Sequence, residues 1–166
     1  MVWANDDLVI QDFEDNKSLE ENKWTFEGSS FDEEARNRFQ EPNRGPHQHY
    51  RMSGHQGRRV LSSMSEKEID AGTGRAVSPT FKVERNYINF LIGGGRYPGR
   101  AGLNLWVGDR LVRSATGRHS AVMKPVSFSV AEFKGREARV ELVDRVANLW
   151  GHIFVDQIVQ SDRPAS

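Results

Sequence analysis

Residues 87–99 of this 166-residue chain read Y-I-N-F-L-I-G-G-G-R-Y-P-G. Apolar side chains recur at every second position from 88 to 92, which predicts a β-strand with one face against a core. We expect the strand to end at glycines 93–95, because consecutive glycines can bend sharply and let a ligand or another segment approach the backbone. Arg96 and Tyr97 follow directly. The stretch therefore predicts a strand that delivers a cation and an aromatic ring to one rim of the fold.

The rest of the chain predicts short strands with turn signals between them, about nine or ten in all, and no amphipathic helix. Pro79 marks its strand as an edge strand, because proline cannot donate to a ladder. Residues 108–110 predict a hairpin turn, and residues 131–135 fit one helical turn or a tight loop. Besides the strand that starts at Tyr87, the expected strands cover residues 8–14, 24–27, 58–63, 76–83, 103–107, 111–116, 125–130, 138–142 and 153–159.

This pattern predicts an all-β fold, specifically a jelly-roll β-sandwich of two antiparallel sheets. The length suits one domain over residues 1–166, with its core at about 8–161.

Composition argues against several classes of function. Lys plus Arg and Asp plus Glu are both 23, so the formal net charge is zero, and we expect no nucleic-acid partner. The chain has no cysteine, which excludes disulfides and thiolate metal sites. No apolar run approaches the roughly 20 residues that span a bilayer, so we expect no membrane partner. The first residues lack the basic and apolar regions of a signal peptide.

The second half of the chain carries several motifs in a fixed order. N-Y-I-N-F-L-I-G-G-G-x-x-P-G starts at Asn86, and N-L-x-V-x-x-x-x-V-R-x-A-T-G starts at Asn104. F-K-G-R-E-A-R-V-E-L-V-D starts at Phe133, and W-G-H-I-x-V-D-x-I starts at Trp150. Together these motifs resemble carbohydrate-binding module family 66, the fructan-binding domain appended to bacterial levanases. The resemblance spans about residues 8–161.

The resemblance implies a jelly-roll sandwich without catalysis of its own, which grips the non-reducing end of a β-fructan such as levan or inulin. It also implies an extracellular or periplasmic protein with a polysaccharide or oligosaccharide partner. The module is expected to be a monomer, within a larger multidomain enzyme or beside one. The pattern departs from the family at Arg96 and Tyr97, where the family has asparagine and histidine, and at Gly102, where it has cysteine. These departures leave the identity of the glycan open.

Residues around the rim suit sugar binding. Trp150 can offer a flat apolar face to a sugar and His152 can bond a hydroxyl group, although Trp150 can equally be a buried ring with its N–H satisfied. The glycines can equally form a tight bend that packs closely. Guanidinium groups and a carboxylate can together hydrogen-bond neighbouring hydroxyl groups of a sugar. The candidates are Arg96, Arg113, Arg145 and Asp144. The alternative is that these residues form ordinary surface ion pairs. The expected ligand-binding residues are Asn89, Gly94, Gly95, Arg96, Tyr97, Arg113, Asp144, Trp150 and His152.

Asp12, Glu14 and Asp156 lie on the first and last expected strands. By analogy with jelly-roll carbohydrate modules, which often pair these strands around a structural calcium, these carboxylates are the candidate ligands for Ca²⁺. Calcium takes several carboxylate and carbonyl oxygens. Asp156 interrupts an apolar strand, where a lone buried carboxylate is costly. The alternative is that Asp156 accepts hydrogen bonds from backbone or hydroxyl groups.

The chain shows no legible catalytic arrangement. Residues 93–99 lack the spacing of a nucleotide-binding loop, and no Gly-x-Ser-x-Gly elbow is present. Glu66 and Glu68, and the histidines of the long loop at 29–56, are expected to be solvated. We therefore expect a binding module rather than an enzyme. The alternative is a structural or protein-interaction module of a larger secreted enzyme, with no sugar affinity of its own.

Overall fold

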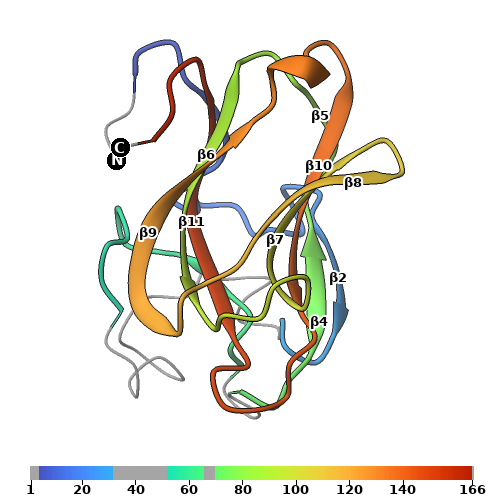
Figure 1. Cartoon of the computed structure of the whole chain (residues 1–166). Coiled ribbons are helices and arrows are strands. Elements are labelled where there is room, and N and C mark those ends of the chain that lie inside the picture. Colours follow the sequence, from blue (N-terminus) through green and yellow to red (C-terminus); the bar gives the residue numbers. More distant parts are fainter. Residues whose placement is uncertain (1–3, 32–51, 66–69, 166) are drawn as a thin grey trace.

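The structure, a computed structural model, describes residues 4–31, 52–65 and 70–165. The described residues form eleven strands in two antiparallel sheets that pack face to face (Figure 1). Sheet A has the order β1-β11-β6-β9, with β3 paired to β11, and sheet B has the order β2-β4-β10-β7-β8, with β5 paired to β10. The jelly-roll β-sandwich expected from the sequence is confirmed.

The strands have the following bounds: β1 (Leu8–Gln11), β2 (Thr25–Gly28), β3 (Leu61–Ser62), β4 (Gly74–Val77), β5 (Phe81–Lys82), β6 (Tyr87–Gly94), β7 (Ala101–Val107), β8 (Arg110–Ala115), β9 (Ser120–Ser129), β10 (Glu137–Asp144) and β11 (Ile153–Ser161). One short 3-10 helix, η2 (Ala131–Phe133), follows β9 where the sequence predicts a single turn. No helix in these residues is long and apolar enough to cross a membrane.

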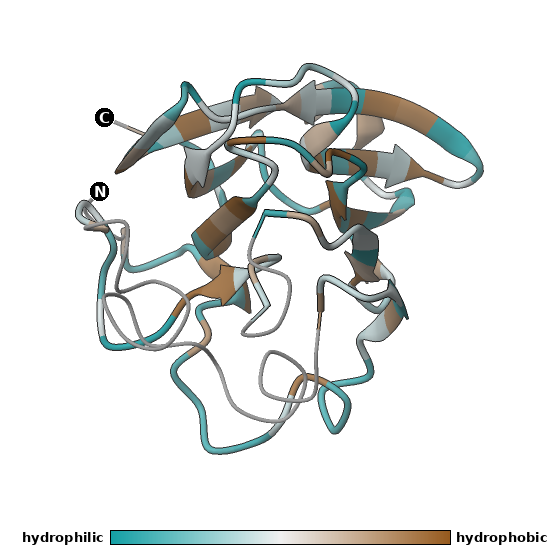
Figure 2. Ribbon diagram, turned by 90° about the horizontal axis from the view of Figure 1, so that it is seen from below, coloured by the Kyte–Doolittle hydropathy of each residue, from teal (hydrophilic) through white to brown (hydrophobic). Residues whose placement is uncertain are grey.

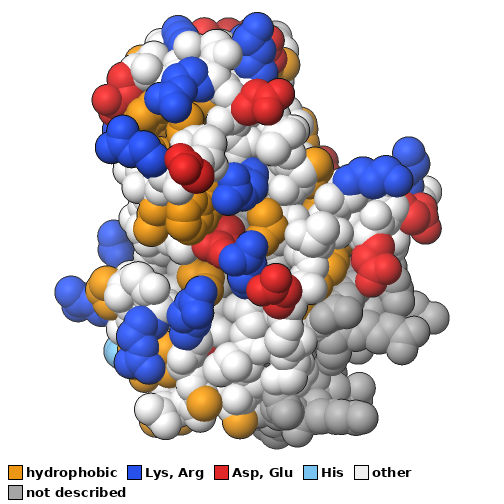
Figure 3. Space-filling view, turned by 90° about the vertical axis from the view of Figure 1, so that its right-hand side faces the viewer, with side chains coloured by type: hydrophobic (Ala, Val, Ile, Leu, Met, Phe, Trp, Pro, Cys, Tyr) orange, Lys and Arg blue, Asp and Glu red, His pale blue; other side chains and the backbone are white. Residues whose placement is uncertain are grey.

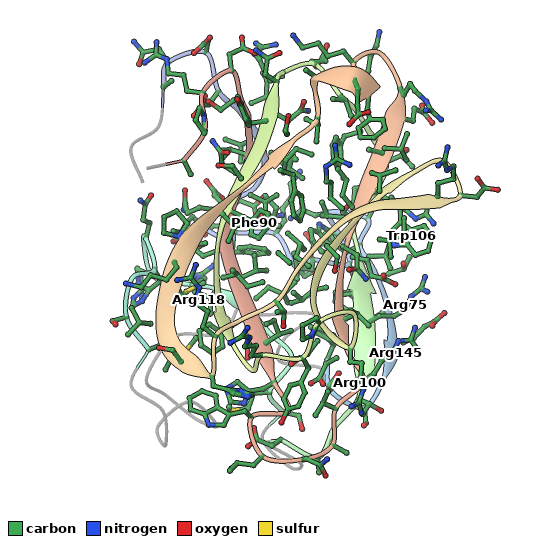
Figure 4. All side chains as sticks on the ribbon, in the orientation of Figure 1. Arg75, Phe90, Arg100, Trp106, Arg118 and Arg145 are labelled. Carbon is green, nitrogen blue, oxygen red and sulfur yellow. The ribbon has the colours of Figure 1, made fainter. Side chains whose placement is uncertain are left out.

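The core lies between the two sheets. The alternating residues of β6, such as Phe90, are fully buried there, together with Val140 and Leu142 of β10. The label in Figure 4 places Phe90 between the sheets, and its ring lies 4.9 Å from that of Phe128 at a steep angle. Hydrophobic segments follow the strands, whereas the connecting loops are mostly hydrophilic (Figure 2). Period-two alternation therefore buries one face of each sheet, as the sequence predicts.

The outer faces of the two sheets differ. Residues 52–60 run beside β9 in Figure 1 and cover the outer face of sheet A. Met52 and Val60 pack there against apolar side chains of β6, β9 and β11. In the described part of the chain nothing comparable covers sheet B, whose outer face carries charged side chains (Figure 3).

Five expected strands differ from the structure. β1 ends at Gln11, because Phe13 turns inward with a φ of 65° and is buried, so Asp12 and Glu14 lie beyond the strand. β6 continues to Gly94, which still pairs with β11. The expected edge strand at 76–83 is two strands, and β4 lies inside sheet B between β2 and β10. Pro79 falls in the gap between β4 and β5, where no ladder needs its missing N–H.

The predicted strand at 58–63 shortens to β3, and β9 begins earlier than predicted, at Ser120. The remaining strands and the Gly108-Asp109 hairpin turn appear where the sequence predicts them. His47, His49, Glu66 and Glu68 lie outside the described residues.

Candidate functional site

Three segments meet at the end of the sandwich where β6 stops, the lower end in Figure 1. They comprise residues 94–97 from the last residue of β6 onward, residues 116–119 after β8 and residues 149–152 before β11. We call these three segments the rim. The Gly95 N–H donates to the carbonyl of His152 over 2.9 Å, which extends the pairing of β6 with β11 into the rim.

The rim glycines let these segments approach closely. A Cβ on Gly95 would stand 2.1 Å from the carbonyl oxygen of Trp150, and one on Gly117 would stand 2.4 Å from that of Gly94. Gly94 also has a φ of 113°, which other residues rarely adopt. The bare backbone of Gly94 and Gly95 is therefore covered by the chain's own segments. This arrangement matches the tight-bend alternative rather than a backbone left open for a ligand.

Backbone hydrogen bonds fix the two residues that follow the glycines. The Tyr97 N–H donates to Thr116 Oγ1 and the Arg96 N–H donates to His119 Nδ1, both over 3.0 Å. The Tyr97 hydroxyl donates to the carbonyl of Leu149 over 2.7 Å. Tyr97 thus joins all three segments of the rim, while the side chain of Arg96 stays exposed.

A series of rings runs from the rim surface to Phe154, which belongs to the apolar cluster on the outer face of sheet A. The ring centroids are 5.3 Å apart for Tyr97 and His119, and 6.0 Å apart for His119 and Trp150. Trp150 then stacks on His152 at 5.4 Å, and His152 on Phe154 at 5.8 Å. His119 is exposed and Trp150 is half-buried, whereas His152 and Phe154 are fully buried. We call Tyr97, His119 and Trp150 the ring cluster.

His152 supports Trp150 from behind. Its Nδ1 lies 2.6 Å from Asp70 Oδ1, and its ring is enclosed between Trp150 and Phe154. Burial lowers the pKa of His152, although the Asp70 carboxylate acts in the opposite direction. Since His152 is 0% exposed, it is not placed to bond a sugar hydroxyl as the sequence analysis expected.

Asp144 also lies inside the fold. Its carboxylate accepts hydrogen bonds from the Ser63 hydroxyl over 2.8 Å and from the Val146 N–H over 3.1 Å. Ser63 Oγ in turn accepts the Ile153 N–H over 2.9 Å. Burial raises the pKa of Asp144 from 3.8 to about 7. Asp144 was expected to contact a ligand, but it is a buried group that holds both ends of the loop at 145–152.

Asn89 and Arg113 do not join the rim. Asn89 is buried in the first half of β6 and donates to the carbonyl of Arg163 over 2.8 Å. Arg113 binds Glu132, and its guanidinium lies 5.2 Å from the ring centroid of Phe133 on η2. Both residues lie on parts of their strands that are away from the rim. For Arg113, the alternative of an ion pair is correct.

Asp12, Glu14 and Asp156 come near one another, since the first two charges contribute to the raised pKa of Asp156. Burial is the largest cause and raises that pKa to about 8. Asp156 Oδ2 accepts the Gln56 N–H over 2.7 Å, and Glu14 Oε1 accepts the Arg58 N–H over 2.8 Å. Among the described residues no group of three or more His, Asp or Glu is arranged to hold a metal ion. Calcium at these carboxylates stays a prediction from the sequence.

Sequence reasoning missed three rim residues. His119 and Thr116 belong to the stretch A-T-G-R-H-S, where the family motif ends at Gly117. Leu149 precedes the W-G-H motif and is 71% exposed. The available signal was position, since Thr116 and His119 lie at or just beyond the end of one motif and Leu149 just before the start of another, and these motif ends meet at the same edge of the sandwich.

By sequence, the chain is similar to part of one known protein. No family model matches the chain. The chain is 31% identical over 163 residues to a protein of Aspergillus rugulosus named "Putative glycosyl hydrolase ecdE", and the match covers 98% of this chain. The chain spans 22% of the length of that curated relative.

Two solved structures are similar to this chain in their fold. A cyclase from Fischerella sp. TAU is 16% identical with a TM-score of 0.49, and the match covers 92% of this chain and 96% of the cyclase. A family 35 carbohydrate binding module from an environmental isolate is 14% identical with a TM-score of 0.43, and the match covers 70% of this chain and 85% of that module.

Proposed function

We propose that the chain is a non-catalytic carbohydrate-binding module and that the rim holds the end group of a sugar chain. The observation that carries this proposal is the ring cluster, in which Tyr97 and Trp150 are half-buried and His119 is exposed, next to the exposed Arg96. A sugar has a C–H face and a hydroxyl edge, and its site combines apolar surface with a few fixed polar groups.

The rim has groups for both parts of a sugar. Trp150 and the exposed Leu149 offer apolar surface beside one another. His119 Nδ1 accepts the Arg96 N–H, so a neutral ring carries its proton on Nε2, from which it can donate to a hydroxyl group. The guanidinium of Arg96 adds further donors. Because hydrogen bonds already fix the rim backbone, binding would cost little ordering entropy.

The burial of the Asp70–His152 pair supports a role without catalysis. Asp70 and His152 form the acid–imidazole pair that a hydrolase would use, but His152 is enclosed between two rings. A catalytic base must come within hydrogen-bond reach of the proton it abstracts. This pair therefore serves to orient Trp150.

The sequence relative supports a module attached to a larger protein, since this chain matches 22% of a protein named a glycosyl hydrolase. Such a module would raise the local concentration of polysaccharide at the attached enzyme. On the strength of the resemblance to family 66, the proposed ligand is the end group of a β-fructan, and the proposed location is extracellular or periplasmic.

The test is calorimetric titration of the folded chain with levan, inulin and fructose, beside xylan and a glucan, with and without calcium. Trp150→Ala and Arg96→Ala should each weaken sugar binding without unfolding the protein. Leu111→Ala is the control, since Leu111 is an exposed apolar residue near the start of β8, outside the rim.

Unchanged affinity in both rim variants would place the site elsewhere. No heat with any glycan, from a folded sample, would favour the alternative, a structural or protein-interaction module of a larger secreted enzyme. This alternative is supported by Arg96 and Tyr97, which stand where family 66 has asparagine and histidine.

A further inference from the structure

We infer that a second site, on the open outer face of sheet B, binds the carboxylate of an acidic sugar. A pocket of about 400 Å³ lies at the end of this face nearest the rim. Its lining comes from β2, β4 and the end of β10, and consists of Glu27, Gly28, Thr73, Gly74, Arg75, Asp144 and Arg145. The volume is within the range of small-molecule sites.

The strand register brings three arginines together at this end of the face, and two of them, Arg75 and Arg145, line the pocket. Asp144 pairs with Ala101 on β7 and with Gly74 on β4, and its side chain turns inward to Ser63. Successive strand residues point to opposite faces, so the next residue, Arg145, faces outward. Its N–H donates to the carbonyl of Arg100 over 2.7 Å, which places those two arginines side by side.

Arg75 completes the set from β4, where it pairs with Val143. Figure 4 shows Arg75, Arg145 and Arg100 one after another along the same side of the molecule. We call these three residues the arginine row.

The arginine row carries an excess of positive charge. Arg75 is paired, with Glu141 at 3.3 Å and with Glu27 at 3.6 Å. Within the described residues, the side chains of Arg100 and Arg145 form no ion pair or hydrogen bond, and both are exposed. The lower part of the face in Figure 3 correspondingly shows more Lys and Arg than acidic side chains. Two guanidinium groups are therefore available to an anion.

The pocket is also built to hold Arg75 in place. Glu141 is buried, and its Oε1 accepts hydrogen bonds from Asn104 Nδ2 and Trp106 Nε1, both over 3.0 Å. Its Oε2 faces Arg75 Nη1. A carboxylate with this many donors fixes the guanidinium that it contacts, so Glu141 is a positioning residue. A planar guanidinium held in this way is suited to a planar carboxylate.

The floor of the pocket adds polar groups. Gly28 and Gly74 have no side chains, and a Cβ on either would stand 2.2 Å from a backbone oxygen, so β2 and β4 approach closely. Ser30 Oγ is buried beneath them, 2.9 Å from where a Cβ on Gly74 would stand, and has no hydrogen-bond partner among the described residues. Arginines above a polar floor suit a uronate residue, which has both a carboxylate and hydroxyl groups.

The experiment is calorimetric titration with trigalacturonate, and with galactotriose as its neutral counterpart. Arg145→Gln should weaken trigalacturonate binding about tenfold or more, as expected for the loss of a charge-assisted contact. Arg110→Gln is the matched control, because it removes the same charge from the exposed β7–β8 turn. Glu27→Gln should tighten binding, since it removes the exposed carboxylate that competes for Arg75.

This second site does not depend on the rim, so Trp150→Ala should leave trigalacturonate binding unchanged. The inference is overturned if trigalacturonate does not bind, or if Arg110→Gln weakens it as much as Arg145→Gln does. It is also overturned if Trp150→Ala is the variant that abolishes binding, which would move acidic sugars to the rim. Equally tight binding of dextran sulfate, with the same response to Arg145→Gln, would show a general polyanion surface instead of a uronate site.

Discussion

Asp144→Asn tests how the loop that carries Trp150 is held. The Asp144 carboxylate binds Val146 at the start of this loop and, through Ser63, the Ile153 N–H at its end. Burial is the main reason that the pKa of Asp144 rises from 3.8 to about 7, and the two hydrogen bonds act against it. The folded protein therefore holds this proton more tightly than the unfolded chain does.

The sign and size of the change in stability with pH follow from the difference between the folded and unfolded pKa of Asp144. The contribution of Asp144 to stability is fully present below about pH 4 and is lost as the pH rises to about 7. Each pKa unit corresponds to about 1.4 kcal/mol, so the whole change amounts to roughly 4 kcal/mol. Between about pH 5 and pH 8, the free energy of unfolding should fall by roughly 3 kcal/mol on account of this group.

Asparagine keeps the shape of the side chain but does not titrate. Its carbonyl can accept the Val146 N–H, and its amide can face Ser63 Oγ. The assay is urea unfolding of both proteins at several pH values in this range, and the quantity compared is the difference between their free energies of unfolding. Asp156, whose pKa burial raises to about 8, titrates in both proteins and cancels in the difference.

The expected result is that Asp144→Asn gains stability relative to the natural chain as the pH rises. Asp109→Asn, in the exposed hairpin turn, is the control for the change in charge. Parallel pH profiles for the natural chain and Asp144→Asn would refute the reasoning, because they would mean that Asp144 is ionised over the whole range.

Three further predictions concern the rim and the metal. Gly95→Ala should cost about 1–3 kcal/mol of stability by overpacking and should weaken sugar binding, because its Cβ would meet the Trp150 carbonyl. Gly135→Ala, where a Cβ meets nothing within 4 Å, should leave the affinity unchanged, and equal affinity losses in calorimetry would contradict the argument. Tyr97→Phe removes one hydrogen bond between rim segments, so thermal and urea unfolding should show a loss of about 1 kcal/mol; no loss would mean that the bond is not formed in solution. If calcium binds the predicted carboxylates, it should raise the melting temperature and Asp156→Asn should abolish the rise, whereas a melting temperature indifferent to calcium and EDTA counts against the ion.

Much of the fold could be predicted because it depends on local patterns. Alternation in residues 88–92 and 138–142 marks strands with one buried face, and the structure buries those faces. The hairpin after Val107 follows from the backbone freedom of Gly108, which has a φ of 59°. The first strand was predicted too long because Phe13 is apolar and fits the alternation, although its positive φ ends β1.

The candidate site was predicted in part. The segments that carry Arg96, Tyr97 and Trp150 do meet, because β6 and β11 are neighbours and both motifs lie where these strands end or begin. The burial of His152 could not be predicted, since its partner Asp70 lies 82 residues away along the chain.

The sequence by itself determined which segments are strands, where they turn and which chemical groups stand at their ends, because these properties depend on neighbours along the chain. Only the tertiary structure decided which of those groups face outward. Asp144 and Arg145 are adjacent in sequence, yet Asp144 is buried with its carboxylate against Ser63, whereas Arg145 is exposed. Strand register and the packing of one sheet on the other make that choice, and both join residues that are far apart in the chain.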